Sequence, residues 1–98
     1  MMTHIVLIKP KATADATAVE DLRQALSGLQ EVITGLTSFS WGANVSPEGK
    51  AQGYELGFIM TFANAADRDA YLPHPAHVAV VPLVRRVADD VLVFDLEA

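Results

Sequence analysis

The pattern of apolar and polar positions predicts four strands. Residues 4–8 (His-Ile-Val-Leu-Ile) form a short β-branched run that ends at Lys9-Pro10, as is typical of a strand. Three further strands are predicted at 36 to about 45, at 54–62 and at 91–94. A polar connection rich in turn-forming residues joins the second and third of these, which predicts a hairpin with a long loop.

Helical periodicity appears between the strands. From residue 13 to about 30, Val19, Leu22, Leu26 and Leu29 recur at spacings of three and four, which predicts one amphipathic helix. A short helix is expected at 65–72. A final helix is expected from 76 to about 89, with valines on its buried side and a solvated end at Asp89 and Asp90. Pro82 lies inside that helix and should kink it.

The order of these elements, β-α-β-β-α-β, predicts a ferredoxin-like α+β fold. Such a fold has a four-stranded antiparallel sheet with helices on one face, and 98 residues suffice for a single domain, 1–98. The opposite face of the predicted sheet is apolar too. It carries Ile5, Leu7, Ile59, Leu92 and Phe94, the residues that we call the bare sheet face. This patch is large for a soluble monomer, so we expect a homodimer in which a second copy covers it.

Composition narrows the choice of partners. The net charge is −5, and the seven basic residues are scattered, which argues against nucleic-acid binding. No apolar run approaches the ~20 residues of a membrane span, and the N-terminus has no export signal, so no membrane partner is expected. The chain has no cysteine, which excludes disulfides and fits a reducing compartment. We therefore expect a cytoplasmic protein.

The stretch 71–77 (Tyr-Leu-Pro-His-Pro-Ala-His) gathers most of the candidate chemistry. A neutral His77 beside the phenol of Tyr71 would be a general acid–base pair, whereas the alternative is that Tyr71 packs its ring and bonds locally. His74 caps a helix or bonds the backbone in one interpretation and lines a site in the other. Two histidines without a third ligand argue against zinc, and the sequence has no Gly-rich phosphate loop. No metal and no cofactor are expected.

The chain resembles the stress-responsive dimeric α/β-barrel family, Dabb. The resemblance runs from His4 to Asp95, and its most specific segment is the run ending His-Pro-Ala-His at residue 77. The other matching segments are 4–9, 39–45, 53–54, 60–62 and 90–95. The resemblance implies a homodimer whose two sheets face one another as a barrel. It implies no single activity, because most members of the family have no assigned reaction.

One plant member of the family is a cyclase that closes a linear polyketide by aldol condensation without a cofactor. Its catalytic pair matches Tyr71 and His77 here, and its pocket histidine and terminal-strand aspartate match His4 and Asp95. The pocket wall differs, since aromatic side chains of that enzyme are replaced here by Leu22, Arg23, Leu26 and Ala88. The match therefore implies the catalytic pair without diagnosing cyclisation.

Two classes of function follow. The first is a stress-response dimer with a small apolar cavity that binds a small molecule. The alternative is a cofactor-independent enzyme, of cyclase, lyase or monooxygenase type, that acts on a small carbonyl or polyketide-like compound. Tyr71 and His77 are the candidate catalytic residues, and the candidate substrate-binding residues are His4, Val6, Phe58, His74, Val93 and Asp95.

Two residues have a structural interpretation beside the functional one. His4 shares a strand face with Val6 and Ile8, so a satisfied core histidine is the alternative to a pocket residue. Trp41, together with Asn44, is similar to residues used by cofactor-free monooxygenases on the same barrel scaffold. That similarity is a fold-level analogy, and packing is the simpler role for Trp41.

Overall fold

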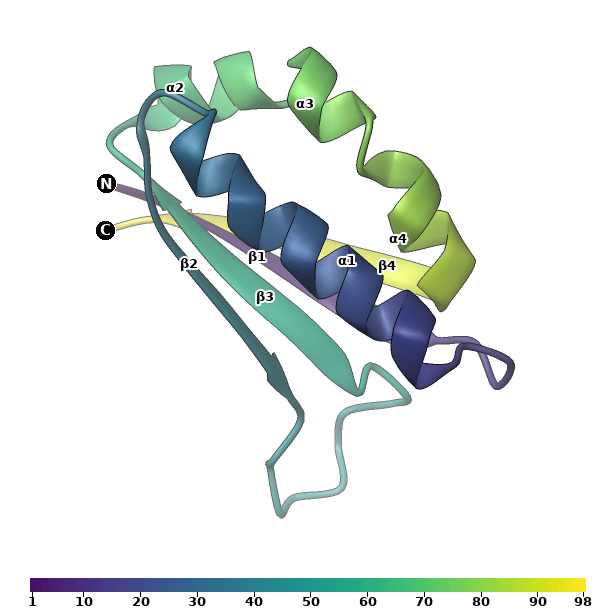
Figure 1. Cartoon of the computed structure of the whole chain (residues 1–98). Coiled ribbons are helices and arrows are strands. Elements are labelled where there is room, and N and C mark those ends of the chain that lie inside the picture. Colours follow the sequence, from purple (N-terminus) through teal and green to yellow (C-terminus); the bar gives the residue numbers. More distant parts are fainter.

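The computed structural model describes all 98 residues, and its strands form one antiparallel sheet (Figure 1). The strand order is β2-β3-β1-β4, so the first strand lies beside both the third and the last. β1 and β3 are central, and β2 and β4 are the edge strands. The strands span Met2–Pro10 (β1), Leu36–Ala43 (β2), Leu56–Phe62 (β3) and Ala88–Glu97 (β4).

All helices cover the same face of this sheet (Figure 1). The predicted β-α-β-β-α-β order is confirmed, with the second helical region divided into three short helices. The helices are α1 (Ala16–Gly28), the 3₁₀ turn η1 (Leu29–Glu31), α2 (Ala65–Tyr71), α3 (Pro75–Val78) and α4 (Val81–Val87). None of them has the length and apolar character needed to span a membrane.

The predicted kinked helix from 76 to about 89 is wrong. α3 ends at Val78 and α4 starts afresh at Val81, so Pro82 lies in the first turn of a new helix. A proline costs little there, because the N–H it lacks would have no intrahelical partner. The sequence pattern also placed Asp89 and Asp90 at a helix end, whereas both belong to β4. The Tyr54 hydroxyl donates a hydrogen bond of 2.6 Å to Asp90 Oδ2.

α1 supplies the helical side of the core. Asp15 is its N-cap and accepts a hydrogen bond of 2.8 Å from the Ala18 backbone N–H, which explains why the helix begins three residues after the predicted start. Leu22 and Leu26 are fully buried against the sheet, as the predicted stripe required. The chain then turns through η1 to β2, and Leu29 continues the buried stripe.

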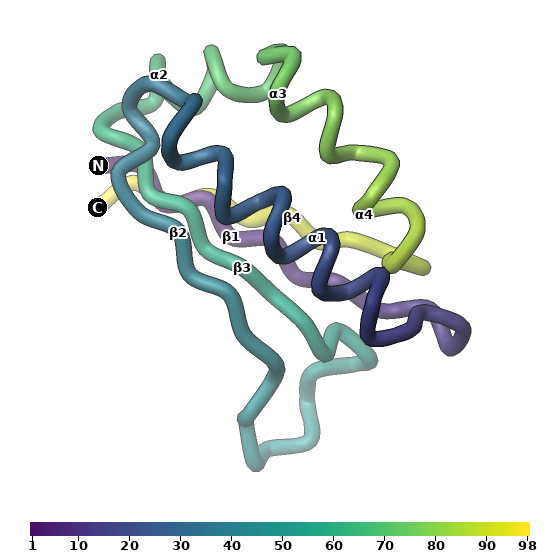
Figure 2. Tube along the Cα trace, in the orientation of Figure 1, coloured from purple at the N-terminus to yellow at the C-terminus, as the bar shows by residue number.

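The two faces of the sheet differ as the alternation of side chains predicted. On the helix side, Ile8, Met60 and Phe62 are fully buried. On the opposite side, Leu92 is 48% and Phe94 is 63% exposed. No part of the chain covers the bare sheet face, and the two termini lie side by side at one end of the sheet (Figure 2).

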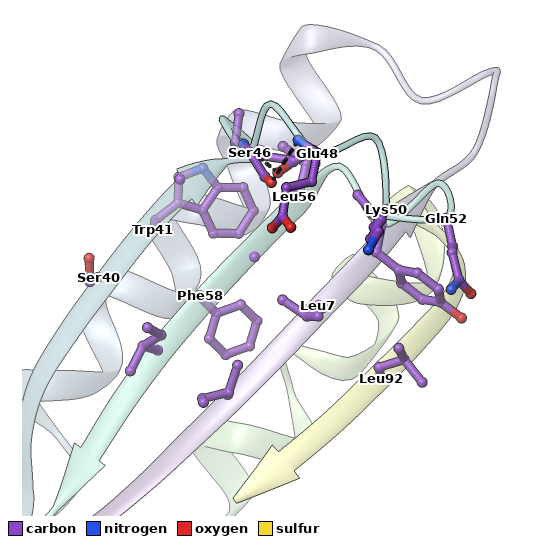
Figure 3. Close-up of a pocket in the computed structure, with 18 residues that line it drawn as sticks. Leu7, Ser40, Trp41, Ser46, Glu48, Lys50, Gln52, Leu56, Phe58 and Leu92 are labelled. Carbon is purple, nitrogen blue, oxygen red and sulfur yellow. Dashed lines mark hydrogen bonds between the residues drawn. The ribbon is translucent and has the colours of Figure 1, made fainter.

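A hollow of about 650 Å³ lies over the bare sheet face, beside the β2–β3 loop. Gly42 and Gly57 are cross-strand partners there, so two neighbouring positions have no side chain. Figure 3 shows Leu7, Leu92 and the loop residues Lys50 and Gln52 around this space. A second copy packed on the bare sheet face would close the hollow from above.

Gly35, which precedes β2, has a backbone conformation and surroundings that favour glycine. Its φ is +85°, and a Cβ added there would lie 2.2 Å from Asp67 Oδ2 in α2. Gly35→Ala should therefore lower the free energy of unfolding by about 2 kcal/mol or more. Gly28→Ala is the matched control, because Gly28 is helical and has open space around it. This control should stabilise the protein by up to about 1 kcal/mol, and urea unfolding measures both. Equal effects of the two substitutions would contradict this interpretation.

Candidate functional site

A second cavity, of about 360 Å³, lies between the helices and the sheet. We call it the helix–sheet cavity. Apolar side chains of α1, α4 and three strands form most of its wall, among them Val6, Phe58 and Val93. Its polar groups come from four side chains, which are His4, Tyr71, His77 and Arg85. An apolar cleft with a few convergent polar groups is the usual form of a small-molecule site.

Tyr71 is the last residue of α2 and is 2% exposed. Asn64 caps this helix by accepting from the Asp67 N–H, and the Tyr71 ring packs against Phe62 with centroids 5.2 Å apart. The Tyr71 hydroxyl has no hydrogen-bond partner within the protein. Every fully buried polar side-chain atom does have such a partner, so this hydroxyl is not fully buried. The hydroxyl therefore opens on the helix–sheet cavity that its side chain lines. Burial raises the pKa of the Tyr71 phenol well above its ordinary value, so it is a hydrogen-bond donor.

The backbone of the 71–77 stretch orients His77. His74 is the N-cap of α3, where its Nδ1 accepts a 3.0 Å hydrogen bond from the Ala76 N–H, and Pro75 occupies the first turn. His77 Nδ1 lies 2.8 Å from the Leu72 carbonyl oxygen. Because a carbonyl only accepts, Nδ1 carries the proton, and Nε2 of the neutral ring keeps its lone pair. The His77 and Tyr71 ring centroids are 4.3 Å apart.

A chain of polar contacts holds His4, the third polar side chain of the helix–sheet cavity. His4, on β1, is buried, and its Nδ1 donates a 2.7 Å hydrogen bond to Asp95 Oδ1 on β4. The other Asp95 oxygen accepts from an Arg68 guanidinium N–H on α2. Asp95 thus fixes the tautomer of His4 and leaves Nε2 without a protein partner. The His4 and Tyr71 ring centroids are 6.2 Å apart, edge to face.

Removal of the Asp95 carboxylate should lower the free energy of unfolding, because two buried or partly buried donors lose their acceptor. Asp95→Ala leaves the His4 Nδ1–H and the Arg68 guanidinium without their acceptor, which should cost about 1.5–3 kcal/mol of unfolding free energy. Asp69→Ala is the matched control, because Asp69 also bonds Arg68 but its side chain is 66% exposed. The control should change the free energy by no more than about 0.5 kcal/mol. Thermal or urea unfolding that shows equal losses would refute this assignment.

Most of the predicted site residues converge on the helix–sheet cavity. His4, Val6, Phe58, Tyr71, His77 and Val93 all line it. Asp95 lies one layer behind, bonded to His4. His74 is the exception: it does not line the cavity, and its Nδ1 caps α3, as the structural interpretation of this residue expected.

The sequence analysis missed Arg68 and Arg85. Arg68 precedes Tyr71 by three residues on α2, and Arg85 follows Val81 by four on α4. Helical spacing of three from the candidate Tyr71 is a signal that would have found Arg68. The sequence analysis named no site residue on the helix of Arg85, so no such signal pointed to Arg85.

Trp41 and Asn44 line the hollow over the bare sheet face. The Trp41 ring stacks on Phe58, with the ring planes 9° apart, so its aromatic surface is used in packing. The side chain of Asn44 bonds within its own loop and to Glu55. No group of three or more His, Cys, Asp or Glu side chains converges at a possible metal site.

Comparison with known proteins places this geometry in a family. The family model of the stress responsive A/B barrel domain matches residues 2–98. The chain belongs to this family. The stress-response A/B barrel domain-containing protein HS1 of Arabidopsis thaliana is 33% identical over 92 residues, which are 94% of this chain and 84% of that protein. Olivetolic acid cyclase of Cannabis sativa is 26% identical over 92 residues, 94% of this chain and 91% of the enzyme.

A solved structure has the same architecture. A dimeric ferredoxin-like protein of unknown function from Jannaschia sp. CCS1 is 34% identical and superposes with a TM-score of 0.86, over 99% of this chain and 98% of that one. The predicted ferredoxin-like fold is therefore confirmed. These proteins share no single named reaction, so the helix–sheet cavity is the feature of this chain from which a function can be proposed.

Proposed function

We propose that this A/B barrel protein is a homodimer that binds a small, largely apolar, oxygen-bearing molecule in the helix–sheet cavity. The observation that carries the proposal is the Tyr71 hydroxyl, a donor without a protein partner that lies at an apolar cavity beside two imidazole rings. A donor that has no protein partner and opens on an apolar cavity favours a ligand with an acceptor oxygen. No nucleic acid or membrane is part of this function.

The dimer would form through the bare sheet face. Its apolar side chains are exposed in the single chain, and the relative from Jannaschia is described as dimeric. Obligate interfaces of this kind commonly bury roughly 2,000 Å² or more. The absence of cysteine is compatible with a reducing compartment, and we place the dimer in the cytoplasm.

Blocking the helix–sheet cavity tests ligand binding. Apolar ketones, aldehydes and β-dicarbonyl compounds would be screened by ligand-observed NMR against the wild type and Val93→Trp. Val93 is 61% exposed at the cavity rim, so a larger ring there should fill the opening without unfolding the protein. Val45→Trp is the matched control, since Val45 is 92% exposed in the β2–β3 loop.

The proposal expects compounds that bind the wild type and Val45→Trp but not Val93→Trp. Equal binding to all three proteins would place the ligand elsewhere. The absence of any binding compound among these classes would count against the proposal.

A second candidate function is cofactor-independent carbonyl chemistry, as in a cyclase or lyase. The favouring observation is the pairing of a proton donor, Tyr71, with a ring nitrogen that can accept a proton, His77 Nε2. His77 would remove a proton from the carbon beside a carbonyl, and the C–H electron pair would move into the enolate. Tyr71 would donate a hydrogen bond to the enolate oxygen. In a cyclase the enolate carbon would then attack a second carbonyl, and His77 would return the proton to the new alkoxide oxygen. In a lyase the enolate would instead expel a leaving group from the neighbouring carbon, and His77 would return the proton to that group. The name of the related olivetolic acid cyclase is compatible with this chemistry.

A further inference from the structure

The charge around the helix–sheet cavity is opposite to that of the protein as a whole. The chain has twelve acidic and seven basic residues, yet no Asp or Glu lines this cavity and one arginine, Arg85, does. Asp95, which is bonded to the cavity residue His4, has one oxygen occupied by His4 and the other by Arg68. A cavity with donors, one fixed cation and no free carboxylate favours an anionic ligand.

Arg85 differs from the other three arginines because it has no carboxylate partner. Arg23 bonds Glu20, and Arg68 bonds Asp69 and Asp95. Arg86 reaches across to α1, where its guanidinium lies 3.2 Å from Asp21 Oδ2. Arg85, its neighbour on α4, makes no ion pair within the chain and lines the cavity instead.

The two ends of the helix–sheet cavity differ, since one is deep and the other is open. Its deep end is formed by buried side chains, among them Val6, Phe58 and Tyr71. Its open end lies over β4, the edge strand, where Val93 and Arg85 are both exposed. A ligand that fills it would therefore have an apolar part inside and a polar group at the rim beside the guanidinium.

We propose that the ligand is a carboxylate with a short or medium-length apolar tail and a second, acceptor oxygen. Its carboxylate is bound at Arg85, its tail lies in the deep end, and its second oxygen accepts from the Tyr71 hydroxyl. This inference rests on the proposed function and names the class of ligand for the same cavity. The planar guanidinium suits a carboxylate because two parallel N–H groups meet its two oxygens. A volume of about 360 Å³ is at the small end for ligand sites and limits the tail accordingly.

Three eight-carbon probes separate charge from apolar burial: octanoate, 2-octanone and octylammonium. Calorimetric titration above pH 7, where a carboxylic acid is ionised, should show octanoate binding at least about tenfold more tightly than either of the others. Arg85→Gln should weaken octanoate about tenfold or more and change 2-octanone less than about twofold. Arg86→Gln is the matched control and should leave both affinities unchanged, because its guanidinium is held at Asp21. Both arginines are exposed, so neither substitution should unfold the protein.

The outcomes distinguish the two levels of the proposal. Equal affinities for octanoate and 2-octanone, unaffected by Arg85→Gln, would overturn the carboxylate inference and leave the apolar binding site intact. An equal loss in Arg85→Gln and Arg86→Gln would also overturn it, because the effect would then be one of overall surface charge. If none of the probes bound the wild type, the carboxylate inference would fail, and failure of the carbonyl screen as well would remove the proposed function.

Discussion

Leu92→Asp is expected to abolish the homodimer. Leu92 lies on the edge strand β4, on the bare sheet face and opposite Leu7 in the β1–β4 ladder, and both side chains point away from the helices. In the proposed dimer the new carboxylate would be buried between two apolar sheets without a partner. Burial of an unpaired charge costs several kcal/mol per protomer, which is a large part of the roughly 5–15 kcal/mol by which a native domain is stable.

Sedimentation velocity at micromolar concentration, together with circular dichroism, measures this effect. The wild type should sediment as a dimer, and Leu92→Asp as a monomer or as unfolded chains. Val45→Asp places the same charge on the exposed β2–β3 loop and should leave the dimer intact. A folded wild-type monomer, or a Leu92→Asp dimer of unchanged stability, would rule out the bare sheet face as the interface.

His77→Ala is expected to have the largest effect on any carbonyl reaction in the helix–sheet cavity. Removal of a positioned general base should lower turnover by about 10²–10⁴-fold. Tyr71→Phe removes one hydrogen-bond donor to the developing oxyanion and should lower it by about 10²-fold. Burial raises the pKa of the Tyr71 phenol because it disfavours the phenolate, so this donor stays protonated as the pH rises above neutrality.

The double variant distinguishes a pair that acts together from two independent residues. Tyr71→Phe combined with His77→Ala should be little worse than His77→Ala alone, because the two groups serve one step. His74→Asn is the control, since asparagine also caps helices and His74 does not line the cavity. Full activity in His77→Ala, with fold and dimer intact, would make the pair structural.

The sequence predicted those parts of the fold that follow from local periodicity. Alternation along β1 and β3 separated Val6 and Phe58 on the helix side from Leu7 and Ile59 on the bare face. The division between α3 and α4 was missed because valine-rich periodicity continues across both helices. Pro82 begins a helix as readily as it kinks one, and local sequence does not distinguish the two.

In the candidate site, too, only the contacts between residues close in the sequence could be predicted. The Tyr71–His77 proximity could be predicted because both residues lie in one seven-residue stretch with two prolines. The contact of Arg68 with Asp95 could not, because it depends on how α2 lies over β4 in three dimensions. The free Tyr71 hydroxyl is likewise a product of packing, since it requires that no side chain of α4 fill the space beside it. Such spaces between elements have no period in the sequence.

The nitrogen-15 spectrum of the histidine rings tests the central claim, that the helix–sheet cavity is the functional site, most directly. In the free dimer His77 should appear as the neutral tautomer with its proton on Nδ1, held by the Leu72 carbonyl. Addition of a β-diketone with an apolar tail should shift the Nε2 signals of His77 and His4 and leave His74 unchanged. A His77 proton on Nε2 in the free protein, or a bound ligand that shifts none of the cavity histidines, would contradict the account.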